Sequence, residues 1–374
     1  MSKPVVCSRC YLSYTGTVAG CLGALGIDCD TVDVGGYSGY AFIVNVTKYQ
    51  TDVSGPTALP TTSATSEGDV VWNEIIKATQ SLGWTIEKYH DPGDCEVLRR
   101  EPTPEERARA MKLFEKVKKE VDERNRPVVI WGLPVPDYGV AVGYEGDSYL
   151  VTTVYGDAKL EEPVPYDRLQ APGRIQALFF RDRVEGEAEV LDREALERAV
   201  RFASLSRSDP IWVIGPAAFD TWADALQNLP RIEDYWSGYG GNCYVAQCVR
   251  ESRYIAAEFL ERLSRKYSGA RSRHLQESAK RYEKELRLME EFTRIFPHKW
   301  PIPEDWRREV QQQKIEKGAE ILKKMRPLEE AVVKEMKKAL EEWKSAWEPS
   351  NLPETRHRGS GGNAIRESSS GAHI

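Results

Sequence analysis

The side chains that could act as nucleophiles or bind metals are few and widely spaced in this sequence. Seven cysteines and five histidines occur among 374 residues, and no histidine lies between residues 91 and 273. A mechanism that needs an imidazole base from that span is therefore excluded. Cys7 and Cys10 have the spacing of half a zinc site. Because no second cysteine pair has that spacing, we expect no metal centre, and we expect no cofactor.

A glycine-rich segment, SGYGGNC at residues 237–243, ends in a cysteine where a long helix is expected to begin. A thiol at a helix N-terminus can be activated or can help to bind an anion, with Trp236 and Asn242 as further ligand contacts. In the alternative interpretation, the segment is an interhelical loop with Asn242 as N-cap and Cys243 in the first helical turn. The alternative is favoured, because a single glycine-rich loop is a weak signal. His274 is a distant partner for Cys243, on the far side of the expected helix.

The charge and the hydrophobic content exclude several classes of protein. Lys and Arg number 52 against 58 Asp and Glu, and hydrophobic residues make up 41% of the chain. That fraction can build a core, whereas the mixed charges argue against nucleic acid binding through a basic surface. No apolar run approaches the ~20 residues of a membrane span, and residues 1–10 lack the apolar stretch of a secretory signal. We therefore expect a soluble cytoplasmic protein with mostly reduced cysteines and with neither nucleic acid nor membrane as a partner.

Hydrophobic periodicity predicts an α+β region in residues 1–190. The run Thr103-Pro104-Glu105-Glu106 is a capping-box start for a helix. Strands over 139–144 and 148–153 are separated by the turn sequence EGD and predict a β-hairpin. A further strand over 175–180 completes an antiparallel sheet.

The chain beyond residue 190 is predicted to form a helical domain, residues 191–348. The last long helix contains Pro327, where we expect a kink or a break. A low-complexity tail, residues 349–374, is expected to be disordered. The long helices are predicted over residues 243–267, 275–296 and 305–347.

Three stretches of the chain read SYTGTVAGCLGALG at 13–26, DYGVAVGY at 137–144 with its hairpin partner YLV at 149–151, and GPAAFDTW at 215–222. They resemble the papain-like cysteine-peptidase fold, in the version seen in bacteriocin-processing peptidases. More closely, they resemble the family of the N-terminal domain of butirosin biosynthesis protein H. The resemblance implies a papain-like α+β domain with an antiparallel sheet, followed by a mostly α-helical domain. It also implies transfer of an aminoacyl group from a carrier protein to an aminoglycoside.

The resemblance also indicates where an active site would lie. In that fold a cysteine opens the first helix, where the helix N-terminus favours the thiolate, and a histidine begins the facing strand. The equivalent positions here hold Ser13 and Asp137, and Cys10 lies one helical turn before Ser13. The third member of the family's triad falls near Thr152 or Thr153. A serine beside a solvent-facing Asp137, without an imidazole, lacks a base suited to neutral pH, so we do not expect cysteine-peptidase chemistry.

Two interpretations of this region stay open. In the first, Asp137 and Tyr138 bind a cationic or hydroxyl-rich ligand, and the glycines and aromatic residues of 36–45 supply close backbone approach and a stacking surface. In the second, residues 36–42 are a tight turn into a strand, and Asp137 caps a backbone group or is solvated. The candidate ligand contacts from the first of these segments are Gly36, Tyr37, Gly39, Tyr40 and Asn45.

Three functions follow from these patterns. The leading hypothesis is a papain-like-fold protein without peptidase activity that binds a small polar or aminoacyl-type ligand in an interdomain cleft. The second is an acyltransferase or amide hydrolase with Ser13, Cys10 or Cys243 as nucleophile and Asp137 orienting the acceptor. The third is an assembly protein without a ligand, which would form a homodimer through its C-terminal helices.

Overall fold

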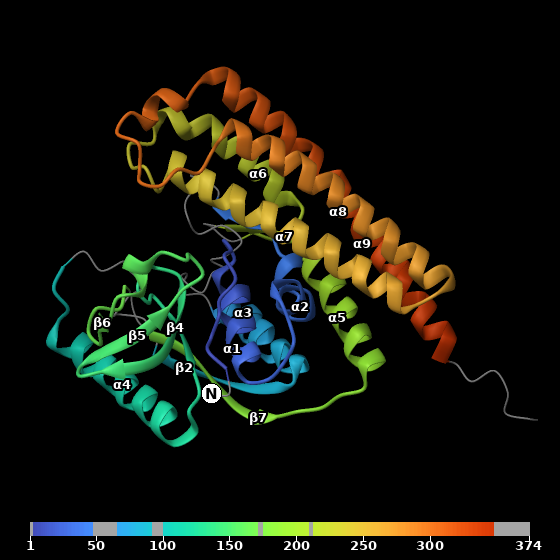
Figure 1. Cartoon of the computed structure of the whole chain (residues 1–374). Helices are drawn as coiled ribbons and strands as arrows, with labels where there is room; N and C mark the ends of the chain where they lie inside the picture. The colour runs from blue at the N-terminus through green and yellow to red at the C-terminus, as the bar shows by residue number, and fades with distance from the viewer. Residues whose placement is uncertain (1–2, 48–65, 92–99, 171–174, 209–211, 348–374) are drawn as a thin grey trace, which may run out of the picture.

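The computed structural model describes residues 3–47, 66–91, 100–170, 175–208 and 212–347. These residues form an α+β fold with an antiparallel sheet and a helical C-terminal part, as the sequence predicts. The sheet lies at one side of the molecule, a group of helices lies beside it, and the long C-terminal helices cross above both (Figure 1). The tail predicted to be disordered, residues 349–374, lies outside the described residues.

Six strands form the main sheet in the order β2-β7-β3-β4-β5-β6, and every neighbouring pair is antiparallel. The predicted hairpin is β4–β5, in which Tyr144 lies opposite Tyr149. The strand predicted over 175–180 is β7, which pairs with β3 and with β2, a strand that the hydrophobic pattern did not indicate. The bounds are β2 Trp84–Asp91, β3 Val128–Trp131, β4 Tyr138–Glu145, β5 Ser148–Thr152, β6 Val164–Pro165 and β7 Ile175–Arg183.

Helix α4 (Pro104–Arg124) covers one face of this sheet. It begins at the predicted capping box, in which the Thr103 hydroxyl accepts from the Glu106 amide at 3.2 Å and the Glu106 carboxylate accepts from the Thr103 amide at 2.6 Å. Its buried side packs on Val128 and Ile130 of β3, and the ring of Phe114 lies 5.0 Å from that of Tyr149. A strong local start signal and an apolar side at helical spacing therefore account for this helix.

Helix α1 (Ser13–Ala24) lies on the opposite face of the sheet and is buried along almost its whole length. Val129 of β3 belongs to its apolar cluster, because successive strand residues face opposite sides of the sheet. Gly16 lets residues 8–10 lie directly on the helix, since a Cβ at this position would overlap the Cys10 thiol and the Ser8 carbonyl. The segment directly before Ser13 therefore packs closely against α1, the helix that begins at Ser13.

The helical C-terminal part differs from the prediction in where its long helices α7, α8 and α9 begin and at Pro327. The first long helix, α7, begins at Tyr239, one turn before Cys243, so Asn242 lies inside the helix and is not its N-cap. The last helix, α9, runs through Pro327 without a break, and the predicted break there is wrong. The helices not yet given are α2 Thr31–Tyr37, α3 Ser66–Thr79, α5 Ala188–Ala203, α6 Ala217–Ala225, α7 Tyr239–Lys266, α8 Gly269–Ile295 and α9 Gln312–Trp347.

Short elements connect these parts. A second, three-stranded antiparallel sheet has the order β1-β9-β8 and joins the segment after α2 to the segment before α6. Its strands are β1 Asn45–Thr47, β8 Arg207–Ser208 and β9 Trp212–Ile214. The 3-10 helices are η1 Tyr40–Phe42, η2 Gln80–Leu82, η3 Ala158–Glu161, η4 Leu226–Arg231 and η5 Trp306–Glu309.

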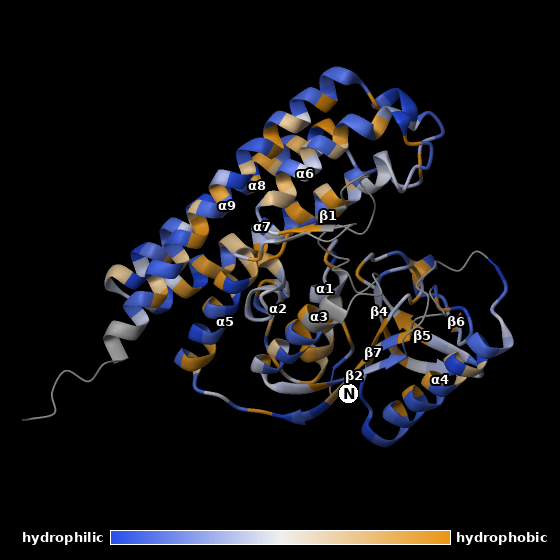
Figure 2. Ribbon diagram, turned by 180° about the vertical axis from the view of Figure 1, so that it is seen from behind, coloured by the Kyte–Doolittle hydropathy of each residue, from blue (hydrophilic) through white to orange (hydrophobic). Residues whose placement is uncertain are grey.

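The two predicted domains share a core across the predicted boundary at residue 190. One apolar cluster contains residues of α1 and α2 together with residues of α7, α8 and α9. The apolar stripes of α8 and α9 face this core, and hydrophilic residues cover much of their outer sides (Figure 2). The stripes therefore serve internal packing, and the boundary itself stays a prediction.

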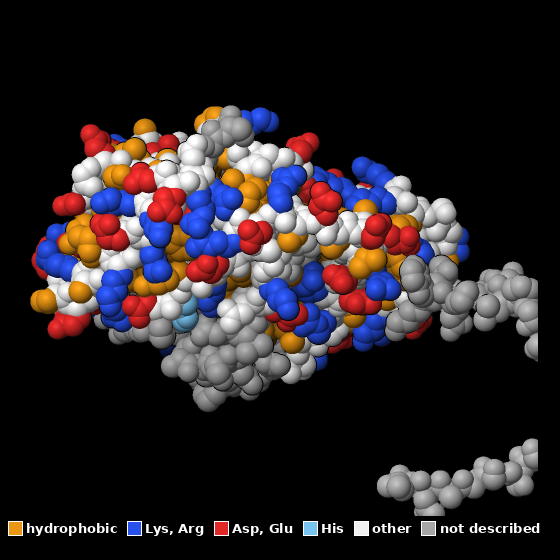
Figure 3. Space-filling model, turned by 90° about the horizontal axis from the view of Figure 1, so that it is seen from below, with side chains coloured by type: hydrophobic (Ala, Val, Ile, Leu, Met, Phe, Trp, Pro, Cys, Tyr) orange, Lys and Arg blue, Asp and Glu red, His pale blue; other side chains and the backbone are white. Residues whose placement is uncertain are grey.

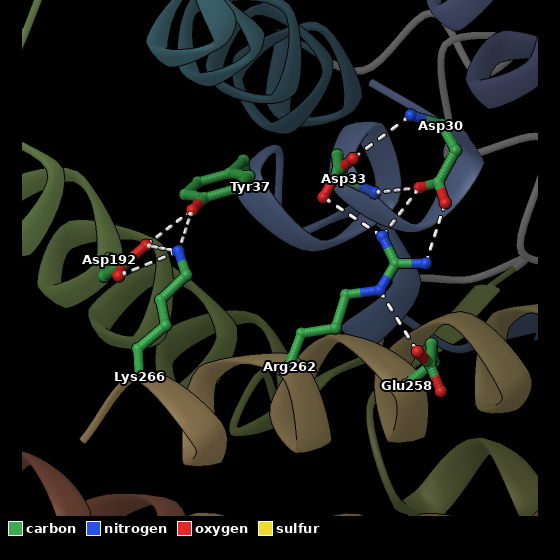
Figure 4. Close-up of polar contacts among 7 residues, drawn as sticks. All are labelled: Asp30, Asp33, Tyr37, Asp192, Glu258, Arg262 and Lys266. Atoms are coloured by element: carbon green, nitrogen blue, oxygen red, sulfur yellow. Dashed lines mark hydrogen bonds and ion pairs between the residues drawn. The ribbon is translucent and has the colours of Figure 1, made fainter. Parts of the chain in front are cut away.

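A polar seam along α7 reinforces this contact (Figure 4). Arg262 binds Asp30 at 2.7 Å and Asp33 at 3.3 Å, which are the capping-box residues of α2. One turn further on, Lys266 binds Asp192 of α5 at 3.0 Å. The guanidinium and the ammonium thus hold α2 and α5 against α7 with charge-assisted hydrogen bonds.

A second charged cluster lies inside the helical part and is fully buried. Arg253 of α7 binds Glu285 of α8 at 2.7 Å and Glu329 of α9 at 2.8 Å, and these three side chains are at most 2% exposed. Arg253 also donates to the Ala41 carbonyl at 3.1 Å, and the Tyr282 hydroxyl donates to Glu329 at 3.0 Å. Two carboxyl groups thus share one guanidinium, and burial together with the nearby Glu329 raises the pKa of Glu285 well above its ordinary value.

This cluster makes a prediction about pH. Because its pKa is raised on folding, the protonated Glu285 stabilises the folded state below the unfolded pKa of about 4.5, and this contribution is lost as the pH rises toward the folded pKa. The variant Glu285→Gln has no carboxyl group to titrate at this position, so its stability does not fall with pH for this reason. Its stability relative to wild type is expected to increase with pH above about 4.5, by at most about 1.4 kcal/mol per pH unit. Urea unfolding of both proteins at a series of pH values measures the difference.

A control for this measurement lies on the same helix. Glu291 of α8 is paired with Lys317 at 3.0 Å, and this pair lowers the pKa of the Glu291 carboxyl. Glu291→Gln should therefore show no rise of relative stability with pH. A stability difference for Glu285→Gln that stays constant between pH 5 and pH 9 would contradict the raised pKa of Glu285.

The outer surface carries both charges. On the face shown in Figure 3, acidic and basic side chains are interspersed and neither kind occupies a region alone. No helix within the described ranges is both long and apolar enough to cross a membrane.

Candidate functional site at the start of helix α1

Ser13 and Asp137 lie side by side, although 124 positions separate them in the sequence. Ser13 is the first residue of α1, and Asp137 directly precedes β4. The helix and the strand meet through the rings of Tyr14 and Tyr138, whose centroids are 5.6 Å apart. The Ser13 hydroxyl donates a hydrogen bond to Asp137 Oδ1 and accepts one from the Tyr138 amide at 3.2 Å.

Asp137 is buried and not solvent-facing, which corrects the expectation from the sequence. Its side chain is 8% exposed. Tyr155 donates to Asp137 Oδ2 at 2.6 Å and Tyr244 of α7 donates to the same oxygen at 3.0 Å. Burial raises the pKa of Asp137, and the hydroxyls of Ser13, Tyr155 and Tyr244 oppose that shift by stabilising the carboxylate.

The hydroxyl groups of Ser13, Tyr155 and Tyr244 form a hydroxyl cluster around the Asp137 carboxylate, and the hydrogen bonds determine which of its atoms donate and which accept. A carboxylate has about four acceptor positions, and Asp137 uses them for three hydroxyl groups and the Tyr138 amide, which donates to Oδ1 at 3.2 Å. Because each hydroxyl directs its proton at the carboxylate, it offers only lone pairs to other groups. As whole residues, Tyr155 and Tyr244 are half-buried.

The third position of the site belongs to Tyr155, not to the predicted threonines. The Thr152 hydroxyl donates to Glu161 at 3.0 Å, and the Thr153 amide donates to the same carboxylate oxygen at 3.0 Å. Tyr155 lies just beyond β5 and reaches back to Asp137. The sequence carried no signal for this role, because the turn after β5 that directs the ring is not a recognisable motif.

A second carboxylate caps the approach to α1. Glu251 of α7 accepts from the Tyr11 amide at 2.7 Å and from the Leu12 amide at 2.6 Å, with the same oxygen, Oε2. Burial raises the pKa of Glu251, and the two backbone donors work against that rise. Sequence reasoning missed this residue, since nothing in the charged face of α7 distinguishes Glu251 from its neighbours.

The predicted thiol nucleophiles are poorly suited to reaction. Cys10 is buried, its thiol donates to the Leu12 carbonyl at 3.4 Å, and burial together with Glu251 and Asp137 raises its pKa far above the ordinary value. Cys243 is buried inside α7, and burial raises its pKa to about 12. Both groups therefore stay protonated near pH 7, which opposes their use as nucleophiles.

One histidine that the sequence reading left aside lies near the site. The ring of His298 is 5.7 Å from that of Tyr11 and 5.8 Å from that of Tyr244, and its Nδ1 lies 3.5 Å from the Tyr11 hydroxyl. Burial lowers its pKa, so the imidazole is neutral near pH 7. Trp236, a predicted ligand contact, packs on the other side of His298 with a centroid distance of 6.4 Å. In the described part of the chain, His298 is hydrogen-bonded to Tyr11 and not to Ser13 or Asp137.

The other predicted contacts are used for packing. Gly36 lies against the ring of Phe259, and the Tyr37 hydroxyl donates to Asp192 at 2.5 Å. Gly39 has a left-handed backbone, with φ of 78°, ahead of η1. The two remaining residues of this segment are buried, Tyr40 against Tyr14 and Trp72, and Asn45 in β1.

The segment around Cys243 is likewise internal. The Asn242 side-chain oxygen accepts from the Trp222 indole at 2.8 Å, in the interior of the helical part. His274 binds Glu335 of α9 at 2.9 Å and is not a partner of Cys243. In the described ranges of the chain, no three His, Cys, Asp or Glu side chains are grouped so that they could hold a metal ion.

Comparison with known proteins adds no relative. No protein-family model and no curated protein matches this chain. The functional interpretation therefore rests on the residues and the geometry of the site.

Proposed function

We propose that this chain is a papain-like-fold protein without peptidase chemistry, which binds a small ligand that carries a protonated amine, such as an aminoacyl group, beside Ser13 and Asp137. One observation carries the proposal: three hydroxyl groups donate to one buried carboxylate. The cluster has a negative charge at its centre and lone pairs at its rim. An ammonium group matches both properties, because it is cationic and has only donors.

The direction from which a ligand would approach follows from the two half-buried tyrosines. Tyr155 comes from the sheet, and Tyr244 comes from α7 of the helical part. A ligand that contacts both hydroxyl groups would lie between the two halves of the chain, as the hypothesis of an interdomain site requires. His298 lies beside Tyr244, Trp236 lies beside His298, and both rings would flank the same side.

Acyl transfer by Ser13 is disfavoured on electrostatic grounds. Among the described residues, the Ser13 hydroxyl donates to the Asp137 carboxylate and no imidazole contacts it, so Ser13 lacks a general base suited to neutral pH. An oxyanion formed beside Ser13 would also lie near Asp137 and Glu251. Each negative charge would disfavour the formation of another nearby.

The proposal predicts selective binding of amines. L-alaninamide is expected to bind with a millimolar Kd, whereas N-acetyl-L-alaninamide, which lacks the ammonium group, should not bind. Tyr155→Phe removes one acceptor of the cluster and should weaken the binding of alaninamide about 10-fold, which equals about 1.4 kcal/mol. Ligand-observed NMR titration measures the three affinities.

Tyr144→Phe is a matched control for this variant. Tyr144 lies on the same hairpin, but its hydroxyl donates to Asp122 at 3.0 Å on the surface. Its loss should leave the affinity for alaninamide unchanged. Equal binding of alaninamide and its N-acetyl derivative would contradict the proposal.

A second candidate function is supported by the position of the Ser13 hydroxyl. It lies on the first residue of a helix, which is the position at which the papain-like fold carries its nucleophile. Incubation with an aminoacyl thioester followed by intact-protein mass spectrometry separates the two functions. Stoichiometric acylation that Ser13→Ala abolishes would favour the acyltransferase, and an unmodified mass favours the binding protein.

A further inference from the structure

The N-terminus of α1, like that of any α-helix, favours the binding of an anion. The first amides of a helix have no partner within the helix, and the aligned peptide dipoles give this end a partial positive charge. In a site for acyl transfer, such amides would face the oxyanion. At this helix the amide of the N-cap residue Leu12, and the Tyr11 amide directly before it, both donate to Glu251.

Glu251 and Tyr244 act from the same face of one helix. They lie seven positions apart on α7, which is two helical turns, so their side chains point in the same direction. Tyr244 reaches Asp137 at 3.0 Å, and Glu251 reaches the two amides before Ser13 at 2.7 and 2.6 Å. The helical part thus brings a carboxylate and a hydroxyl to the two sides of Ser13.

We infer that Glu251 is a specificity-determining residue, whose carboxylate fills the anion position at the start of α1 so that the Ser13 site rejects anionic ligands. The inference rests on the proposed function for the location of the ligand and adds what the site excludes. A free carboxylate, phosphate or sulfate would have to displace Glu251 from two backbone donors and would lie near the charge of Asp137. An ammonium group meets neither obstacle and is attracted by both carboxylates.

Glu251→Ala tests the inference by vacating the anion position. Wild-type protein should show no difference in thermal midpoint between 20 mM sodium sulfate and sodium chloride of equal ionic strength. Glu251→Ala should melt several degrees higher in sulfate than in chloride. In 15N TROSY spectra of this variant, sulfate should shift the amide signals of Tyr11 and Leu12 saturably, and these shifts locate the anion.

Two further variants keep the test decisive. Glu258→Ala removes a carboxylate two helical turns further along the same face of α7, where it binds Arg262 at 3.1 Å, and should gain no sulfate binding. Glu251→Gln keeps an acceptor oxygen for the backbone amides, so it should fold even where the alanine variant does not. It should weaken alaninamide binding at least 3-fold, because the attracting charge is removed.

The outcomes separate this inference from the proposed function. If Glu251→Ala folds and gains no sulfate shift at Tyr11 and Leu12, or if it is unfolded and Glu251→Gln binds alaninamide as wild type does, the inference is overturned. The proposed function still stands in both cases when wild type binds alaninamide. If the variant gains sulfate binding and wild type binds no amine, the anion position is established and the proposed function fails.

Discussion

Replacing Arg253 by methionine is expected to lower the free energy of unfolding by about 3–5 kcal/mol. Arg253 is fully buried and serves as the shared partner of Glu285 and Glu329. Methionine matches the length of the side chain but leaves two carboxyl groups in the core without a cation. Most of this loss of stability comes from burying two carboxyl groups without a partner, and less comes from the loss of the ion pairs themselves.

The same substitution also removes a hydrogen bond between the two halves of the chain. The Arg253 guanidinium donates to the Ala41 carbonyl in η1, which follows α2 and precedes β1. Its loss should therefore destabilise the packing of η1 on α7 as well as the contacts among α7, α8 and α9. Because the structure has one continuous core across this point, we expect a single cooperative transition at lower denaturant concentration.

Urea unfolding followed by circular dichroism measures the loss, with Arg262→Met as the matched control. Arg262 lies on the same helix and contacts three carboxylates, yet its side chain is one third exposed. Water can solvate those carboxylates after the substitution, so the control should cost less than about 1 kcal/mol. Equal losses for the two variants would contradict the role assigned to burial.

Asp137→Asn is expected to weaken the binding of L-alaninamide at least 30-fold, which equals about 2 kcal/mol. The amide removes the negative charge at the centre of the cluster. Its NH2 group also donates, so at least one of the hydroxyls of Ser13, Tyr155 and Tyr244 must reverse its direction and present a proton to the ligand. Both changes oppose an ammonium group.

The fold should survive this substitution. Asparagine has the shape of aspartate, and the substitution removes a charge whose burial raises its pKa and therefore costs stability when it is ionised. We expect a thermal midpoint within a few degrees of wild type. The control Asp122→Asn changes a surface carboxylate that accepts from Tyr144, and it should alter neither the midpoint nor the affinity. An unchanged affinity in Asp137→Asn would contradict the proposed site.

Sequence patterns predicted those parts of the fold that local chemistry determines. The capping box at Thr103 and the turn between β4 and β5 both depend on residues within a few positions, and both are confirmed. The break predicted at Pro327 is wrong, because packing between helices outweighs the local effect of the proline. A proline inside a helix costs stability locally, but α9 packs against α8 along its length, and that tertiary packing sustains the helix through the proline.

The candidate site shows what sequence reasoning could and could not supply. The pairing of Ser13 with Asp137 came from the family resemblance, which places a helix start beside a strand start. The contribution of α7 could not be predicted, because Tyr244 and Glu251 reach the site only through the packing of α7 on α2 and η1. The glycines and aromatic residues of 36–45 were interpreted as a possible ligand surface, whereas Gly36 provides room for the ring of Phe259.

The central claim is that a protonated amine binds at the hydroxyl cluster around Asp137. An NMR titration of 15N-labelled wild-type protein with L-alaninamide tests it most directly, because the Tyr138 amide donates to both Ser13 and Asp137 and reports on their charge. The account predicts a saturable shift of the Tyr138 signal with alaninamide and none with N-acetyl-L-alaninamide. A Tyr138 signal that stays in place with both compounds, or moves equally with both, would contradict it.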